Sequence, residues 1–280
     1  MSKSRTLYVS DLDGTLMQPD ATISHESARL LNAAIADGKL FTVATARTPA
    51  TVAGILRPLD MRLPAIVMTG ASVWDPRNGS YSHIRHFSDD AARRLIDVYR
   101  QTGTNSFIFT LDHDMIDIYH VGGELNEIQR QFYEERLHSP FKRFHLSADG
   151  SDTLPDDLSK LILAYTMLPD EKAFSTYEVS RHIPGIRAQY YHDIFGPEVG
   201  ILEAFAADAT KANAVKDMAD RLGADRIVCF GDNINDLPMM AVADVAVAVE
   251  NALPEVKDAA DLVIGPNTDD SVARFIAEAL

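Results

Sequence analysis

Short apolar runs that end in polar or turn-forming residues occur near both ends of this chain. Near the N-terminus they are Leu7–Val9, Leu40–Ala44 and Ala65–Met68. Towards the C-terminus they are Ile227–Phe230, Val245–Val249 and Leu262–Ile264. Because both faces of a strand in a parallel sheet are buried, continuous apolar runs of this length predict parallel strands.

Segments with helical periodicity lie between these runs. One helix is expected to begin after Ser24, a residue that favours the N-cap, and to end before Gly38. Further helices are predicted at Pro49–Leu56, Thr210–Leu222, Leu237–Val242 and Ser271–Leu280. Strands that alternate with helices predict an α/β fold: a doubly wound, Rossmann-like parallel sheet with right-handed crossovers.

The middle of the chain has a different pattern. Apolar and polar residues alternate on both sides of Asp112–Asp114, which predicts an antiparallel hairpin. Helices are expected to begin at Ser88, Glu124 and Glu171, and strands at Leu161 and Ile186. We interpret this block as an inserted α+β cap domain. The expected boundaries are 1–82 and 195–280 for the core, and 83–194 for the cap.

Composition and charge narrow the class of protein. The chain has 280 residues, and its formal net charge of −15 argues against nucleic acid and anionic membranes as partners. The N-terminus lacks the pattern of a signal peptide, and no apolar run is long enough to span a membrane. The single cysteine, Cys229, lies within an apolar run and is expected in the core. These features favour a cytoplasmic protein.

Unusual polar residues lie where predicted elements of the core begin or end. They are Asp11, Asp13, Thr45, Lys211, Asp232 and Asp236, and Gly14 allows a sharp turn after the first strand. A doubly wound sheet brings such positions to one edge. Clustered carboxylates repel one another unless a cation neutralises them, and all-oxygen ligands suit Mg²⁺. A lysine and a hydroxyl group beside them predict a site for phosphoryl transfer.

In order along the chain, Asp11-Leu12-Asp13-Gly14-Thr15, Thr45, Lys211 and Gly231-Asp232-Asn233-Ile234-Asn235-Asp236 resemble the four motifs of haloacid-dehalogenase superfamily phosphatases. The large insertion is similar to that of the Cof-type branch. The resemblance covers the whole core, and it covers the cap only in position and size.

The resemblance implies a role for each matching residue. Asp11 is expected to be the nucleophile and a metal ligand. Asp13 is expected to protonate the leaving oxygen, to activate water and to offer its backbone carbonyl to the metal. Thr45 would bind the phosphoryl group, and Lys211 would neutralise charge. Asp232 would bind Mg²⁺ directly, with Asp236 acting through water or Lys211 and Asn235 supporting the phosphate side.

Several positions depart from the family pattern. Ala46, Thr69, Ala212 and Glu250 replace the residues that are usual there, although none of these changes removes a catalytic group. Arg47 has two interpretations, a substrate or phosphate contact and a structural arginine on the surface. Thr45 also has a second interpretation, as a cap of its strand end.

The resulting hypothesis is Mg²⁺-dependent hydrolysis of small phosphomonoesters, such as sugar phosphates, through an aspartyl phosphate. The first alternative is a phosphomutase or phosphotransferase on the same scaffold. A second is a signalling module that holds a phosphorylated aspartate as a switch. Such modules are about half this length and carry no inserted domain. Asp13 also argues against a switch, because a general acid/base beside the nucleophile hastens loss of the phosphoryl group. The sequence names neither the substrate nor an oligomeric state.

Overall fold

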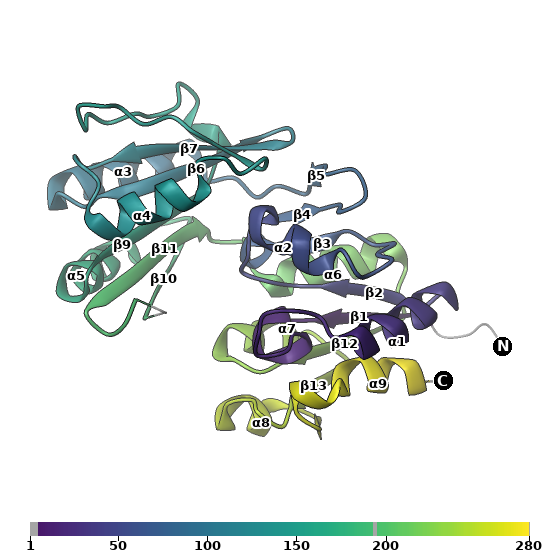
Figure 1. Cartoon of the computed structure of the whole chain (residues 1–280). Coiled ribbons are helices and arrows are strands. Elements are labelled where there is room, and N and C mark those ends of the chain that lie inside the picture. The colour runs from purple at the N-terminus through teal and green to yellow at the C-terminus, as the bar shows by residue number, and fades with distance from the viewer. Residues whose placement is uncertain (1–4, 193–194, 280) are drawn as a thin grey trace. The chain divides into compact units, whose positions relative to one another are not determined.

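The computed structural model of the protein describes residues 5–192 and 195–279 and divides into two compact units. The core unit consists of Met1–His83 and Thr210–Leu280, and the inserted unit is Ile84–Ala209. Each unit has a β-sheet of its own (Figure 1). No helix in the described part of the chain is both long enough and apolar enough to cross a membrane.

The main sheet of the core unit has five parallel strands in the order β14-β13-β12-β1-β2. These strands are β1 (Thr6–Ser10), β2 (Leu40–Val43), β12 (Arg226–Gly231), β13 (Val245–Val249) and β14 (Leu262–Ile264). The predicted doubly wound parallel core is thereby confirmed. Cys229 lies on β12 and is fully buried, as expected.

A small antiparallel sheet continues the core beyond β2. It consists of β3 (Ala65–Val67), β4 (Ser72–Trp74) and β5 (Tyr81–Ser82). A single parallel bridge between Ala44 and Ile66 connects it to the end of β2. The sequence pattern predicted β3, whereas β4 and β5 are too short to show a periodicity.

Among the described residues, the core helices begin within one residue of the expected positions, except α8, which the sequence did not predict. They are α1 (His25–Ala36), α2 (Pro49–Leu56), α6 (Lys211–Leu222), α7 (Leu237–Met240), α8 (Pro254–Ala259) and α9 (Ser271–Glu278). The side chains of Ser24 and Thr210 cap α1 and α6, accepting the backbone N–H of Ser27 at 2.9 Å and of Asn213 at 3.0 Å. Helix α1 packs against α9, and α6 packs against α7.

The sheet of the inserted unit has the strand order β10-β11-β9-β6-β7-β8. Its strands are β6 (Ser106–Asp112), β7 (Met115–Val121), β8 (Lys142–Phe144), β9 (Leu161–Pro169), β10 (Ile186–Tyr191) and β11 (Val199–Ala206). All neighbouring strands are antiparallel except the pair β7–β8. The predicted hairpin is present as β6 and β7, which turn at His113 and Asp114.

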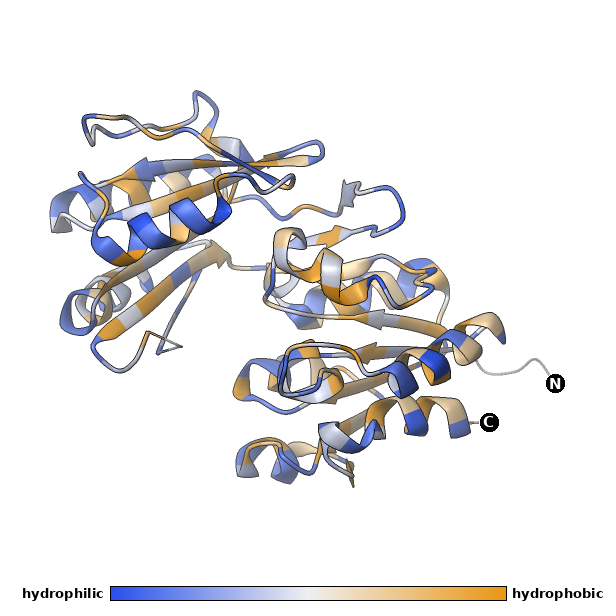
Figure 2. Ribbon diagram, viewed as in Figure 1, coloured by the Kyte–Doolittle hydropathy of each residue, from blue (hydrophilic) through white to orange (hydrophobic). Residues whose placement is uncertain are grey.

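In the described part of the inserted unit the α-helices are α3 (Asp89–Thr102), α4 (Glu127–Arg136) and α5 (Asp170–Ser180). Helix α3 packs with Ile108 of β6 in one hydrophobic cluster. Because side chains alternate along a strand, Phe107 points to the opposite face, where its ring lies 5.3 Å from that of Phe132 on α4. Figure 2 shows apolar residues concentrated on the strands and hydrophilic residues on the outer side of α4.

The second boundary of the insertion differs from the expected one. Residues 195–209, which we expected in the core, belong to the inserted unit because β11 pairs with β9 and β10. The strand is almost entirely buried, so its apolar pattern resembles that of the core strands. An apolar run shows that a strand is buried but does not identify the sheet that accepts it.

Candidate active site

Asp11 lies directly beyond the end of β1, at the carboxyl edge of the parallel sheet. Its backbone N–H donates to the carbonyl of Phe230 on β12 at 3.0 Å, so its position is set by the register of the two strands. The residue is 5% exposed. A buried carboxylate at this edge requires a partner, because an isolated buried charge is costly.

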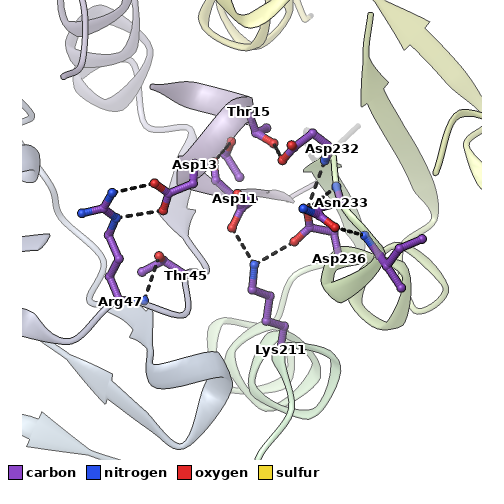
Figure 3. Close-up of polar contacts among 11 residues, drawn as sticks. Asp11, Asp13, Thr15, Thr45, Arg47, Lys211, Asp232, Asn233 and Asp236 are labelled. Carbon is purple, nitrogen blue, oxygen red and sulfur yellow. Dashed lines mark hydrogen bonds and ion pairs between the residues drawn. The ribbon is translucent and has the colours of Figure 1, made fainter. Parts of the chain in front are cut away.

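Lys211, the first residue of α6, supplies that partner (Figure 3). Its Nζ donates to Oδ1 of Asp11 at 2.5 Å and to Oδ1 of Asp236 at 2.7 Å. The lysine is 1% exposed. A cation at the N-terminus of a helix is disfavoured by the helix dipole. The two carboxylates offset this cost and hold the ammonium group between them.

The loop after β12 brings two further carboxylates to the same edge. Asp236 is fully buried, and its Oδ2 accepts the backbone N–H groups of Asp232 at 3.1 Å and Asn233 at 3.2 Å. These bonds fix the shape of the loop. A Cβ at Gly231 would lie 2.6 Å from the Cβ of Asp236, so only glycine allows this close approach.

Asp232 faces the turn that follows β1. Its Oδ1 accepts the hydroxyl of Thr15 at 2.7 Å. Gly14 has a φ of +75°, and a Cβ at this position would lie 2.4 Å from Oδ2 of Asp232. Glycine is therefore required both by the backbone conformation and by the space that Asp232 occupies.

The clustered acids carry more negative charge than Lys211 neutralises. Burial raises the pKa of Asp11 above its usual range, Lys211 opposes this shift, and Asp236 and Asp232 add to it. Burial also raises the pKa of Asp232, to about 6. Burial alone would lower the pKa of Lys211, but its contacts with Asp11 and Asp236 raise it. Lys211 is therefore held as an ammonium ion.

The same acids fit a divalent cation. Asp11, Asp232 and Asp236 each place a carboxylate oxygen within 4.8 Å of the others. The donors are all oxygen, the set that Mg²⁺ prefers, and the excess negative charge favours a cation. The side chain of Asp13 is not in this group. The expectation that Asp13 offers its backbone carbonyl stays a prediction.

Asp13 and Thr45 meet at Arg47 (Figure 3). The guanidinium of Arg47 donates to both carboxylate oxygens of Asp13, at 2.6 and 2.8 Å. Thr45 is buried at the end of β2, and its Oγ1 accepts the backbone N–H of Arg47 at 3.1 Å. That hydroxyl can still donate its proton to a ligand.

The turn Met68–Gly70 connects the Thr45 loop to the start of α6. The N–H of Thr69 donates to the carbonyl of Thr45 at 3.0 Å, and a Cβ at Gly70 would lie 2.2 Å from the carbonyl oxygen of Thr210. Thr69 itself has a φ of +55° and ψ of +26°, a left-handed conformation that a β-branched residue rarely adopts. Its buried hydroxyl has no hydrogen-bond partner among the described residues.

Replacing Thr69 by asparagine should stabilise the core unit. Asparagine tolerates the left-handed region, so Thr69→Asn should stabilise the fold by about 1 kcal/mol and raise the unfolding temperature by roughly 2–4 °C. Thr69→Val is the matched control: it keeps the β-branch and the backbone strain, so any gain that it shows measures the loss of the unpaired hydroxyl rather than relief of the strain. A melting curve followed by the fluorescence of Trp74, the only tryptophan, measures the change. A lower melting temperature for Thr69→Asn would contradict the claim that the backbone at Thr69 is strained.

Three of the other singled-out positions lie on the surface. Asn235 is exposed, and so are Ala46 and Glu250. The supporting role expected of Asn235 therefore stays a prediction. Ala212 is partly buried in the first turn of α6.

Two residues of the site had no predicted role. Thr15 positions Asp232, and Asn251 donates from Nδ2 to the carbonyl of Gly14 at 2.7 Å. Thr15 stands inside the first motif, and its hydroxyl next to Gly14 was a usable signal. Asn251 follows β13 at the same sheet edge, but a single asparagine in a loop gives no comparable signal.

The chain is similar to known proteins in both sequence and fold. Residues 8–276 match the family model described as haloacid dehalogenase-like hydrolase. The chain is 24% identical to 5-amino-6-(5-phospho-D-ribitylamino)uracil phosphatase YitU of Bacillus subtilis, over 97% of this chain and 96% of that protein. It is 26% identical to pyridoxal phosphate phosphatase YbhA of Escherichia coli, over 95% of each. A crystal structure of a haloacid dehalogenase-like hydrolase from Bacteroides thetaiotaomicron has a TM-score of 0.74 at 21% identity, covering 97% of this chain and 98% of that one.

Proposed function

Because this chain belongs to the haloacid dehalogenase-like hydrolase family and is a phosphatase, we propose that it hydrolyses small phosphomonoesters through an aspartyl phosphate on Asp11. The observation that carries the proposal is the buried contact of Asp11 with Lys211 at the edge of the parallel sheet. This contact supports the proposal because a carboxylate that attacks an anionic phosphoryl group needs a fixed positive charge beside it.

In the first half of the reaction, a carboxylate oxygen of Asp11 attacks phosphorus and forms an acyl phosphate. The bond between phosphorus and the ester oxygen breaks, and Asp13 donates a proton to that oxygen. Lys211 offsets the negative charge shared by Asp11 and the phosphoryl group. The hydroxyl of Thr45 is at the same sheet edge and can donate to a phosphoryl oxygen.

In the second half, water attacks the phosphorus of the acyl phosphate. Asp13, now a carboxylate, accepts a proton from this water. The bond between phosphorus and Asp11 breaks, which releases inorganic phosphate and regenerates the Asp11 carboxylate. Asp13 thus serves first as an acid and then as a base, and it ends each cycle protonated again.

We also propose that Asp11 and Asp232 hold Mg²⁺, with Asp236 close by. When bound, the ion would neutralise these carboxylates and the charge on the phosphoryl group. Asp236 already binds Lys211 and two backbone N–H groups, which favours an indirect role for it. Thr15 holds the carboxylate of Asp232 in place through its hydroxyl.

The substrates we propose are small phosphorylated metabolites such as sugar phosphates. Two relatives are named for the dephosphorylation of a phosphoribitylaminouracil and of pyridoxal phosphate, both of them small phosphomonoesters. The strongly negative net charge of the chain fits a small substrate that is bound by local groups rather than a polyanion.

Release of inorganic phosphate from a panel of such metabolites tests the proposal. We expect turnover with added Mg²⁺ and a loss of about 100-fold or more with a chelator, reversed by excess Mg²⁺. Phosphate release should equal substrate consumption, whereas transfer to an added sugar would support the phosphotransferase alternative. Turnover that is unaffected by the chelator would contradict the metal site.

A further inference from the structure

The two acids of the first motif lie in different surroundings, although only Leu12 separates them in sequence. The side chain of Asp11 is 8% exposed and is bound by Lys211. The side chain of Asp13 is 54% exposed and is bound by Arg47. Each acid therefore has its own cation. Asp13 is also outside the group of carboxylates that could share a metal ion.

The contact between Arg47 and Asp13 is bidentate. Nε of Arg47 donates to Oδ2 of Asp13 at 2.8 Å, and Nη2 donates to Oδ1 at 2.6 Å. Two parallel hydrogen bonds from a planar guanidinium fix both the position and the plane of a carboxyl group. A half-exposed aspartate without such a partner rotates among several rotamers.

The backbone of Arg47 is itself fixed at the site. Its N–H donates to Oγ1 of Thr45 at 3.1 Å, and its carbonyl accepts the N–H of Met68 at 3.0 Å. The loop that places the hydroxyl of Thr45 therefore also places the guanidinium. The orientation of Asp13 is in this way tied to the position of Thr45.

We propose that Arg47 is a positioning residue that holds the carboxyl group of Asp13 in the orientation needed for proton transfer to the leaving oxygen. This inference rests on the function proposed above. Because both oxygens of Asp13 accept from Arg47, Arg47 has to release one of them for that oxygen to hold the proton that Asp13 later donates. The role differs from the direct phosphate contact that the sequence also allowed for Arg47.

Two esters with different leaving groups separate these roles. An alkyl phosphate needs a proton on its leaving oxygen, whereas p-nitrophenyl phosphate releases a stable anion without one. The parameter to measure is kcat/KM, because it reports the steps up to formation of the acyl phosphate. We expect Arg47→Gln and Arg47→Lys to lower kcat/KM for the alkyl ester by about 10- to 100-fold. For p-nitrophenyl phosphate the loss should stay within about threefold, because proton transfer contributes little there.

A double-mutant cycle shows whether Arg47 acts through Asp13. Asp13→Asn should show the same dependence on the leaving group. Adding Arg47→Gln to Asp13→Asn should cause little further loss, because there is then no carboxylate left to position. Arg77→Gln is the matched control, because it removes another bidentate contact, between Arg77 and Asp75 of the core unit. It should leave kcat/KM unchanged for both esters.

The proposal would be overturned if Arg47→Gln lowered kcat/KM equally for both esters and did so also in the Asp13→Asn background. Arg47 would then contact the phosphoryl group directly. An Arg47→Gln enzyme with unchanged kcat/KM for the alkyl ester would overturn it as well. Melting curves of the variants show whether a loss of activity follows from unfolding. Unfolding would lower kcat/KM for both esters by the same factor. Failure of the proposed function is distinguishable, because it would appear in the wild type as an absence of phosphate release.

Discussion

Replacing Asp11 by asparagine should abolish turnover of every phosphomonoester while leaving the fold intact. An amide is a very poor nucleophile, so the acyl phosphate cannot form, and we expect kcat to fall by about 10⁴-fold or more. The stability should not fall with it. Asp11→Asn removes a buried carboxylate whose pKa is raised by burial, and Lys211 keeps its contact with Asp236.

The expected pattern is therefore an inactive protein with an unchanged or higher unfolding temperature. Stability and activity commonly oppose each other in this way, because clustered charges serve the reaction at a cost to the fold. Asp258→Asn, on the exposed side of α8, is the control and should leave both quantities unchanged. Substantial turnover by Asp11→Asn would show that Asp11 is not the nucleophile.

Replacing Lys211 by methionine should damage both the fold and the reaction. Methionine has a similar length, but the buried carboxylates of Asp11 and Asp236 lose the ammonium that binds them. Leaving a buried charge without its partner costs about 3–5 kcal/mol, so the core should unfold at a markedly lower concentration of urea. Loss of a positive charge beside the phosphoryl group should also lower kcat by about 10²- to 10³-fold.

The single tryptophan makes the stability loss measurable in the core unit. Trp74 is 2% exposed on β4, and its fluorescence in urea reports the unfolding of that unit. Lys216→Met, at an exposed position on the same helix, is the matched control and should change neither stability nor kcat. If Lys211→Met were as stable as the control, the ammonium would not be what balances the buried acids.

The parallel core, and the meeting of Asp11, Lys211 and Asp236 at its edge, could be predicted from the sequence because the signals are local. Each core strand is a continuous apolar run, and each site residue stands at the end of such a run or at a helix start. Lys211 is the clearest case. A lysine in the first turn of a helix is electrostatically unfavourable, and its two carboxylate partners explain why it is there.

The place of strand β11 could not be predicted from the sequence, because the signal that decides it is not local. Its burial is visible in the residues, but its place between β9 and β10 depends on pairing between distant segments. Arg47 illustrates the same limit. Nothing in the residues near Arg47 identifies Asp13 as its partner, because the contact joins two loops 34 positions apart. The left-handed conformation of Thr69 likewise follows from the turn that joins Thr45 to α6.

The account depends most on Asp11 forming a covalent bond to phosphorus, and trapping that bond tests it most directly. Borohydride reduces an acyl phosphate of aspartate to homoserine, which mass spectrometry can locate in a peptide. Wild-type protein that is treated with borohydride during turnover of a good substrate should contain homoserine at position 11, and Asp11→Asn should contain none. Homoserine at a different aspartate, or full turnover with no trapped residue under any quench condition, would contradict the account.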